Sequence, residues 1–359
     1  MFPQKPFPVM QNLWTMALAA TLLAGCSAPN VHLNPARDDV APSLLHVALD
    51  KRELEQLQRA AASALANAPD PLPVVHVEGT LATTEAYKRA SKARRDWGLM
   101  STLASLYSAT RDGRYLERYE RYLLAWLDVY AISGNPIDET DLGHWLLAYR
   151  TAGSALAPTT QALMRTFACR LSERYQERQP PQRRTTTNNW QSHRVKLAVM
   201  GAYVCADPDL TAGAIALFKG QIRDNLLPTG EAVDFFERDA LHYVVYSVEP
   251  LLEAALFSTL HGRPLSQYVG PQGQSVGRTL EWLAPYARGE LTHQEFVRSI
   301  VRFDAERAAA GVAGFSGLFD PRKARHTYWL ASQLDTRWAE LAASLGTPSI
   351  VQRAAWMAK

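Results

Sequence analysis

The chain has little charge imbalance, almost no strand-like alternation and, after its amino-terminal region, no apolar run long enough to span a membrane. Its 359 residues are 47% hydrophobic and 20% charged, a composition that excludes an intrinsically disordered chain. The formal net charge is only +3. This balance gives no indication of a nucleic-acid-binding protein, so we expect no nucleic acid among its partners.

Cysteine is also scarce, with three residues at Cys26, Cys169 and Cys205. Neither Cys169 nor Cys205 belongs to a CxxC or zinc-like cluster, so we predict no metal and no cofactor. The two residues can pair in an oxidising compartment or remain separate buried thiols. The sequence leaves both possibilities open.

The one long apolar run covers residues 13–24 and follows Lys5. It is shorter than the roughly 20 residues that a spanning helix needs, and it is built like an export signal. The run closes with Leu23-Ala24-Gly25-Cys26, which resembles the lipobox of bacterial lipoproteins. The resemblance implies removal of residues 1–25, lipidation of Cys26 and a periplasmic protein, anchored to the outer membrane by lipid alone. The alternative is an ordinary secretory signal with an incidental cysteine.

We expect residues 26–50 to be a tether and residues 51–359 to be a single all-α domain. Apolar residues recur at spacings of three and four through most of the latter region, and short turn signals separate the repeats. Such helices, joined by short loops, form antiparallel hairpins that stack as a solenoid, a bundle or a closed ring. The predicted helices cover 51–67, 96–110, 114–131, 141–154, 158–177, 188–206, 209–227, 240–261, 293–310 and 321–345.

A polar stretch at 178–187 leads into an unusual helix start, Asn188-Asn189-Trp190-Gln191-Ser192-His193-Arg194. Asn188 suits a helix cap. Asn189 and His193 lie four residues apart and therefore share one helix face. An amide beside an imidazole is a plausible way to hold an anionic group next to a base.

The second candidate segment runs from Asp234 to Tyr246. If a helix begins near Asp239, Arg238 lies at its mouth, and His242 and Tyr246 share one face. Aromatic packing in the core is the structural alternative. Together the two segments supply Asn, His, Arg and Tyr, a set that suits removal of a carbon-bound proton beside a carboxylate. That chemistry is β-elimination from a uronic acid.

Both segments resemble the active-site segments of the alginate lyase superfamily of polysaccharide lyases. The more specific match is the frame Ala-Leu-x-Tyr-x-x-Tyr-x-x-x-Pro-Leu over residues 240–251, and weaker similarity extends over most of 85–310. The resemblance implies an incomplete (α/α) toroid with a cleft for an anionic polysaccharide such as alginate or glucuronan. It also implies that Asn189 neutralises the substrate carboxylate, that Tyr243 is the acid or the acid and base, and that Tyr246 is a neighbouring cleft residue.

Two positions depart from the family pattern. In alginate-specific enzymes a histidine follows the Asn pair directly, whereas this chain has Trp190 there and His193 one turn later. Arg238 also lies closer to Tyr243 than the corresponding arginine does. We therefore predict Asn189, His193, Arg238 and Tyr243 as catalytic residues. We predict Trp190, Arg194, His242 and Tyr246 as substrate-binding residues, and we interpret Phe303, Asp304 and Arg307 as structural.

Stereochemistry decides which group is the base. In mannuronate and glucuronate the C5 hydrogen and the C4 oxygen lie on the same side, so Tyr243 can be base and acid in turn, with His193 assisting. In guluronate and galacturonate they lie on opposite sides, and His193 as base with Tyr243 as acid is the natural division. The sequence does not choose between these substrates.

Two other functions remain open. A glycoside hydrolase on a helical toroid needs two facing carboxylates, and the candidates Asp234, Glu237 and Asp239 crowd into about one turn. A non-catalytic, glycan-binding lipoprotein with the same fold is favoured by Trp190 in the usual histidine position.

Overall fold

The computed structural model describes residues 49–177 and 184–358. The predicted signal segment, Cys26, most of the tether and the polar stretch at 178–183 lie outside the described residues. Within those residues no helix is both long and apolar enough to cross a bilayer.

The described residues contain helices and no strand, with two isolated antiparallel bridges, which confirms the all-α prediction. The α-helices are α1 (Lys51–Ala66), α2 (Glu85–Thr110), α3 (Gly113–Val129), α4 (Pro136–Glu139), α5 (Gly143–Ala152), α6 (Pro158–Gln176), α7 (Asn189–Cys205), α8 (Pro208–Asn225), α9 (Val233–Arg238), α10 (Leu241–Thr259), α11 (Val276–Ala287), α12 (Arg302–Ala309), α13 (Arg325–Leu334), α14 (Ala339–Ser344) and α15 (Ile350–Met357).

The helix expected at 321–345 is interrupted after Leu334, where α13 ends, and the chain becomes α-helical again in α14. A second predicted helix is largely wrong. Residues 293–301 are not helical, and only α12 remains of the helix expected at 293–310. Long-range pairing explains the difference, because the Phe296 and Ile300 amides donate to the Asp239 and Glu237 carbonyls instead of to carbonyls four residues back. The segment is therefore fixed against the turn between α9 and α10, where part of the second candidate segment lies.

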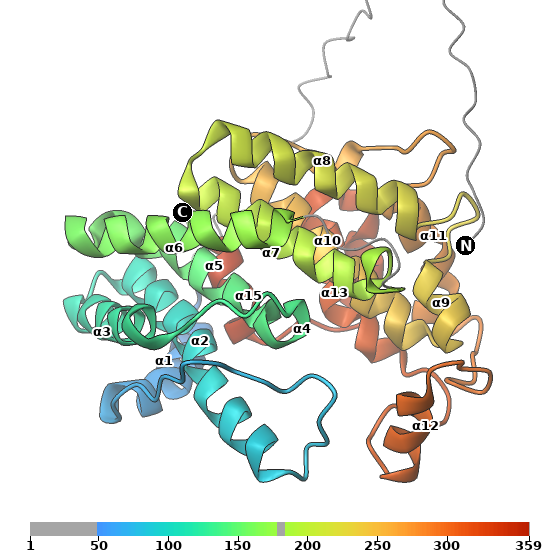
Figure 1. Cartoon of the computed structure of the whole chain (residues 1–359), viewed down its shortest axis with the longest axis horizontal. Coiled ribbons are helices and arrows are strands. Elements are labelled where there is room, and N and C mark those ends of the chain that lie inside the picture. Colours follow the sequence, from blue (N-terminus) through green and yellow to red (C-terminus); the bar gives the residue numbers. More distant parts are fainter. Residues whose placement is uncertain (1–48, 178–183, 359) are drawn as a thin grey trace, which may run out of the picture. The chain divides into compact units, whose positions relative to one another are not determined.

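Helix α7 lies at the centre of the helical packing. It packs against α5, α6, α8 and α10, which surround it in Figure 1. Most of its side chains are buried, including polar ones at its amino-terminal end such as Asn189, Ser192 and His193. A helix buried on all sides has no single polar face, so the apolar period of α7 does not mark its functional side.

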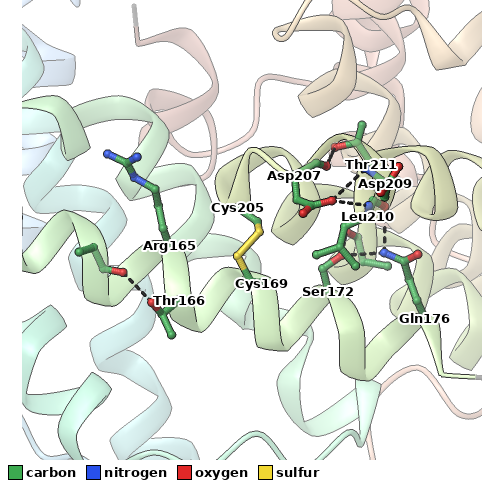
Figure 2. The surroundings of a disulfide bond; sticks show 12 residues. Arg165, Thr166, Cys169, Ser172, Gln176, Cys205, Asp207, Asp209, Leu210 and Thr211 are labelled. Atoms are coloured by element: carbon green, nitrogen blue, oxygen red, sulfur yellow. Dashed lines mark hydrogen bonds between the residues drawn. A yellow bond between two sulfur atoms is a disulfide. The ribbon is translucent and has the colours of Figure 1, made fainter.

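A disulfide joins Cys169 on α6 to Cys205 at the end of α7, with 4.8 Å between the Cα atoms (Figure 2). Polar contacts support the same region, since the Gln176 amide donates to Ser172 Oγ and to the Leu210 carbonyl, both at 2.9 Å. Asp207 caps α8 through its contacts with the Asp209 and Leu210 amides. The open question of whether the two cysteines pair is answered by this bond.

Removing the disulfide is expected to lower stability without changing the chemistry of the protein. The two residues are 36 positions apart. A crosslink that closes a loop of that size lowers the entropy of the unfolded chain, which adds about 3–4 kcal/mol to the free energy of unfolding. Urea unfolding of a Cys169→Ala/Cys205→Ala variant measures the loss. A variant as stable as the parent would contradict this expectation.

Candidate functional site

A cavity of about 450 Å³ brings together residues from both candidate segments. The first segment contributes Asn189 and Trp190 at the start of α7. Further walls come from the loop before α2, from residues around α4 and from α12. The residues that the second segment contributes are Arg238, His242, Tyr243 and Tyr246. A larger cavity of about 1020 Å³, beside α1 and α2, contains none of the predicted site residues.

Buried hydrogen bonds hold Asn189 in place at the amino-terminal end of α7. Asn188 caps the helix, its side chain accepting from the Trp190 amide, as predicted. Asp234 is fully buried and accepts from both the backbone amide and the side-chain NH₂ group of Asn189. Asn225 donates to the other oxygen of Asp234 at 3.0 Å. Because the Asn189 NH₂ group has two protons, one remains for a ligand.

Asp234 is a buried carboxylate with several donors around it. Burial raises its pKa, and the hydrogen bonds from Asn189, Asn225 and Ser247 act in the opposite direction. Its position behind Asn189, outside the cavity lining, makes it a group that orients the amide.

Tyr243 lies on the first turn of α10 and is 6% exposed. The Arg238 guanidinium lies over its ring, 4.0 Å from the centroid. Arg307 Nη1 donates to its phenol oxygen at 3.0 Å. Burial raises the pKa of Tyr243, whereas the two cations and the hydrogen bond from Arg307 lower it. Burial outweighs these opposing contributions, so the pKa of Tyr243 lies above its usual value.

A tight turn brings Arg238 and Tyr243 together. Asp239, between α9 and α10, has a left-handed backbone with φ 49°, which aspartate tolerates better than most residues. Its carboxylate accepts from the Arg298 amide at 2.9 Å, and its carbonyl accepts from the Phe296 amide at 2.8 Å. The start of α10 is capped from a distance, since the Leu241 and His242 amides donate to Glu295.

His193 is buried behind Tyr246 and does not line the cavity. The two rings are 4.4 Å apart between centroids. His193 Nδ1 is 2.7 Å from Thr140 Oγ1, which also accepts from Lys196 Nζ at 2.7 Å. Nε2 is buried and has no hydrogen-bond partner among the described residues. Burial, with a smaller contribution from Lys196, lowers the pKa of His193 well below its usual value, so the ring is neutral.

Of the four predicted substrate-binding residues, three line the cavity and one does not. Trp190, His242 and Tyr246 line the cavity. Arg194 does not; it is buried on α7 and donates to the Thr185 carbonyl at 2.6 Å and to Gln191 Oε1 at 3.2 Å. Sequence spacing placed Arg194 near the site but could not show that its guanidinium is engaged elsewhere.

His242 is neutral in this setting. Burial and the nearby Lys323 lower its pKa to about 4. Lys323 Nζ lies 3.4 Å from His242 Nδ1. Because an ammonium group only donates, Nδ1 is the acceptor and Nε2 carries the ring proton. His242 is therefore a hydrogen-bond donor at the edge of the cavity.

The interpretation of residues 303–307 as purely structural is incomplete. Phe303 and Arg307 line the cavity, and Arg307 donates a hydrogen bond to the Tyr243 phenol oxygen. Asp304 is buried and forms an ion pair with Arg238. Nothing in the spacing of these residues relates them to Tyr243, because 64 positions separate Arg307 from it. Only the fold reveals the association.

Two further wall segments are not among the predicted site residues. Buried Asp138 accepts from the Val77 and Glu78 amides, both at 2.7 Å, and so fixes the loop that passes over the cavity. Arg94 and Asp141 form a 3.2 Å ion pair in the lining.

In the part of the chain that the structure describes, no three His, Cys, Asp or Glu side chains gather as metal ligands.

Residues 47–293 match a family model described as alginate lyase. No curated protein sequence matches significantly.

Among solved structures, the chain is similar to an alginate lyase from Bacteroides ovatus, with 15% identity, a TM-score of 0.62 and coverage of 85% of this chain and 92% of that one. It is also similar to alginate lyase A1-III from Sphingomonas species A1, with 19% identity, a TM-score of 0.51 and coverage of 76% and 91%. A variant of A1-III complexed with a tetrasaccharide has 18% identity, a TM-score of 0.53 and coverage of 77% and 88%. These similarities confirm the predicted fold, an incomplete (α/α) toroid.

Proposed function

The chain belongs to the alginate lyase family of polysaccharide lyases, and on this premise we propose that it cleaves a 4-O-linked uronate polysaccharide by β-elimination. The observation that carries the proposal is that Tyr243 and Asn189 line the same cavity. Arg238 contacts the ring of Tyr243, and Arg307 donates to its phenol oxygen. In this proposal a proton-transfer group and a carboxylate-binding amide act on the same sugar ring.

The reaction assigns a step to each group. Asn189 donates to the uronate carboxylate and stabilises the negative charge that develops when the C5 proton leaves. The Tyr243 phenolate takes that proton. The C4–O4 bond then breaks, a C4–C5 double bond forms, and the Tyr243 phenol returns a proton to the departing oxygen. No water is consumed, and the product has an unsaturated uronate at its new non-reducing end.

The position of His193 supports Tyr243 as both base and acid. A base must reach the proton that it abstracts, and the His193 ring lies behind Tyr246, outside the lining. One group that acts twice requires the C5 hydrogen and the C4 oxygen on the same side of the ring. We therefore propose mannuronate- or glucuronate-containing polymers, with Trp190, His242 and Tyr246 as sugar contacts.

A glycoside hydrolase is less well supported. None of the candidate carboxylates Asp234, Glu237 and Asp239 lines the cavity. Asp234 holds Asn189, Glu237 accepts from the Asn188 side chain at 3.3 Å, and Asp239 pairs with Arg298 at 3.2 Å. The carboxylates in the lining are Glu78 and Asp141, and Asp141 pairs with Arg94. This does not provide two unengaged, facing carboxylates of the kind that hydrolysis needs.

We also propose that the protein is exported and anchored by lipid at Cys26. The lipobox-like sequence supports this, and so does the Cys169–Cys205 disulfide, because such bonds persist mainly in oxidising compartments. Metabolic labelling with a fatty acid, compared between the parent and Cys26→Ser, tests the anchor. Equal labelling of both would contradict it.

A panel of uronate polymers tests the proposed activity. Mixing the protein with mannuronate-rich alginate, glucuronan, hyaluronan, guluronate-rich alginate and pectate should raise ultraviolet absorbance with at least one of the first three. New reducing ends without absorbance would indicate a hydrolase. Binding without new ends would indicate a glycan-binding protein, and cleavage restricted to guluronate or pectate would contradict the single-tyrosine assignment.

A further inference from the structure

Arg307 occupies an unusual position beside the reacting oxygen. Its guanidinium lies over two phenyl rings, 4.1 Å from the centroid of Phe303 and 4.8 Å from that of Phe315. The side chain is 25% exposed. Helix α12, which carries Arg307, lies beyond residues 47–293, the part that matches the family. Contact with the two rings restricts the guanidinium and displaces water from it.

The two arginines at Tyr243 contact different parts of its side chain. Arg238 lies over the ring face and is paired with Asp304, which is 1% exposed and also accepts from Ser299 Oγ at 2.6 Å. Arg307 instead donates to the phenol oxygen itself, and its nearest approach to Asp304 is 3.9 Å, too long for a hydrogen bond. Of these two arginines, Arg307 is the one that contacts the atom that exchanges the proton.

We propose that Arg307 is a catalytic residue, whose hydrogen bond to the Tyr243 oxygen stabilises the phenolate that removes the C5 proton. The inference rests on the proposed elimination and deepens it. During the reaction the phenolate becomes a phenol while Arg307 keeps its own proton and remains the donor. Asp304 is a positioning residue, because it holds Arg238 against the ring and lies beside Arg307.

The charged and titratable groups around Tyr243 come from several elements. Those that favour the phenolate are Arg238 on α9 and Arg307 on α12, and Asp304 opposes them. Tyr246 and neutral His242 lie beside Tyr243 on α10. Glu295 and Lys323 contact the backbone and the ring of His242. A cation within hydrogen-bond distance lowers a phenol pKa by about one unit or more. Loss of Arg307 should therefore raise the pKa of Tyr243, because burial already raises it and one of the two opposing cations is gone.

The test compares Arg307→Met and Arg307→Lys with the control Arg302→Met. Arg302 lies on the same helix, is 92% exposed and pairs with Glu306, away from the cavity. The ionisation of Tyr243 is followed without substrate as the ultraviolet titration difference between each protein and its Tyr243→Phe counterpart. The pH dependence of kcat/KM is measured on the polymer that the panel identifies.

We expect Arg307→Met to move both the Tyr243 titration and the rising limb of the kcat/KM profile, which follows formation of the phenolate, to higher pH by about one unit or more. Arg307→Lys should give a smaller shift, and Arg302→Met none. If Arg307→Met fails to fold, the Lys variant decides the question. An unchanged titration would overturn the inference, as would a raised KM with the same pH profile, which would indicate substrate binding alone.

The two proposals fail in different ways. If the parent protein forms no unsaturated product from any polymer, the proposed function is wrong, whereas the substrate-free titration still reports on Arg307. If elimination occurs but the Tyr243 titration is the same in the parent and in both Arg307 variants, the function stands and the role of Arg307 is wrong.

Discussion

Tyr243→Phe is expected to lower kcat/KM by about 10³- to 10⁴-fold, because one oxygen supplies both proton-transfer steps. The substitution removes the oxygen and keeps the ring. Arg238 can still lie on the ring face, which it contacts at 4.0 Å, so the turn between α9 and α10 should remain intact. The loss should therefore be one of chemistry and not of folding.

Initial rates of ultraviolet-absorbing product measure this effect, with thermal unfolding as the check on structure. Tyr107→Phe is a matched control, since Tyr107 is half-buried on α2 and packs beside Arg111, outside the cavity. Full activity in Tyr243→Phe would remove the assignment of this residue. Loss of activity in both variants would show that the assay reports general damage.

Asn189→Ala is expected to lower kcat by about 10²- to 10³-fold, the usual effect of losing one donor to a developing anion. The enolate-like charge on the substrate carboxylate then has no amide to stabilise it. Some loss of stability should accompany the change, because buried Asp234 loses the hydrogen bond that the Asn189 side chain donates to it.

Its neighbour provides the control for that stability cost. Asn188→Ala removes the cap of α7, which should cost about 1 kcal/mol of stability while leaving the cavity lining unchanged. Chemical denaturation and kinetics on both variants separate the effects. A larger fall in kcat for Asn188→Ala than for Asn189→Ala, at a temperature where both are folded, would contradict the role of Asn189.

The sequence predicted the local features of the site well. The start of α7 at Asn188 and Asn189 follows from capping chemistry, and the start of α10 near Asp239 follows from its helical spacing. Both predictions depend on residues that are neighbours in the chain. They were sufficient to suggest that the two segments supply one reaction.

Long-range packing was beyond such reasoning. His193 shares a face with Asn189, but helical spacing does not tell what packs against that face, and Tyr246 covers the imidazole. Arg307 reaches Tyr243 because residues 293–301 pair with the turn at Asp239 and are not helical. No local pattern in the sequence encodes either contact.

The mass of the products from one defined mannuronate or glucuronate oligosaccharide tests the account most directly. The parent protein should yield one unsaturated fragment, lighter by one water molecule than the corresponding hydrolysis product, and Tyr243→Phe should leave the oligosaccharide intact. Two saturated fragments from the parent protein, or an unsaturated fragment formed equally fast by Tyr243→Phe, would contradict it.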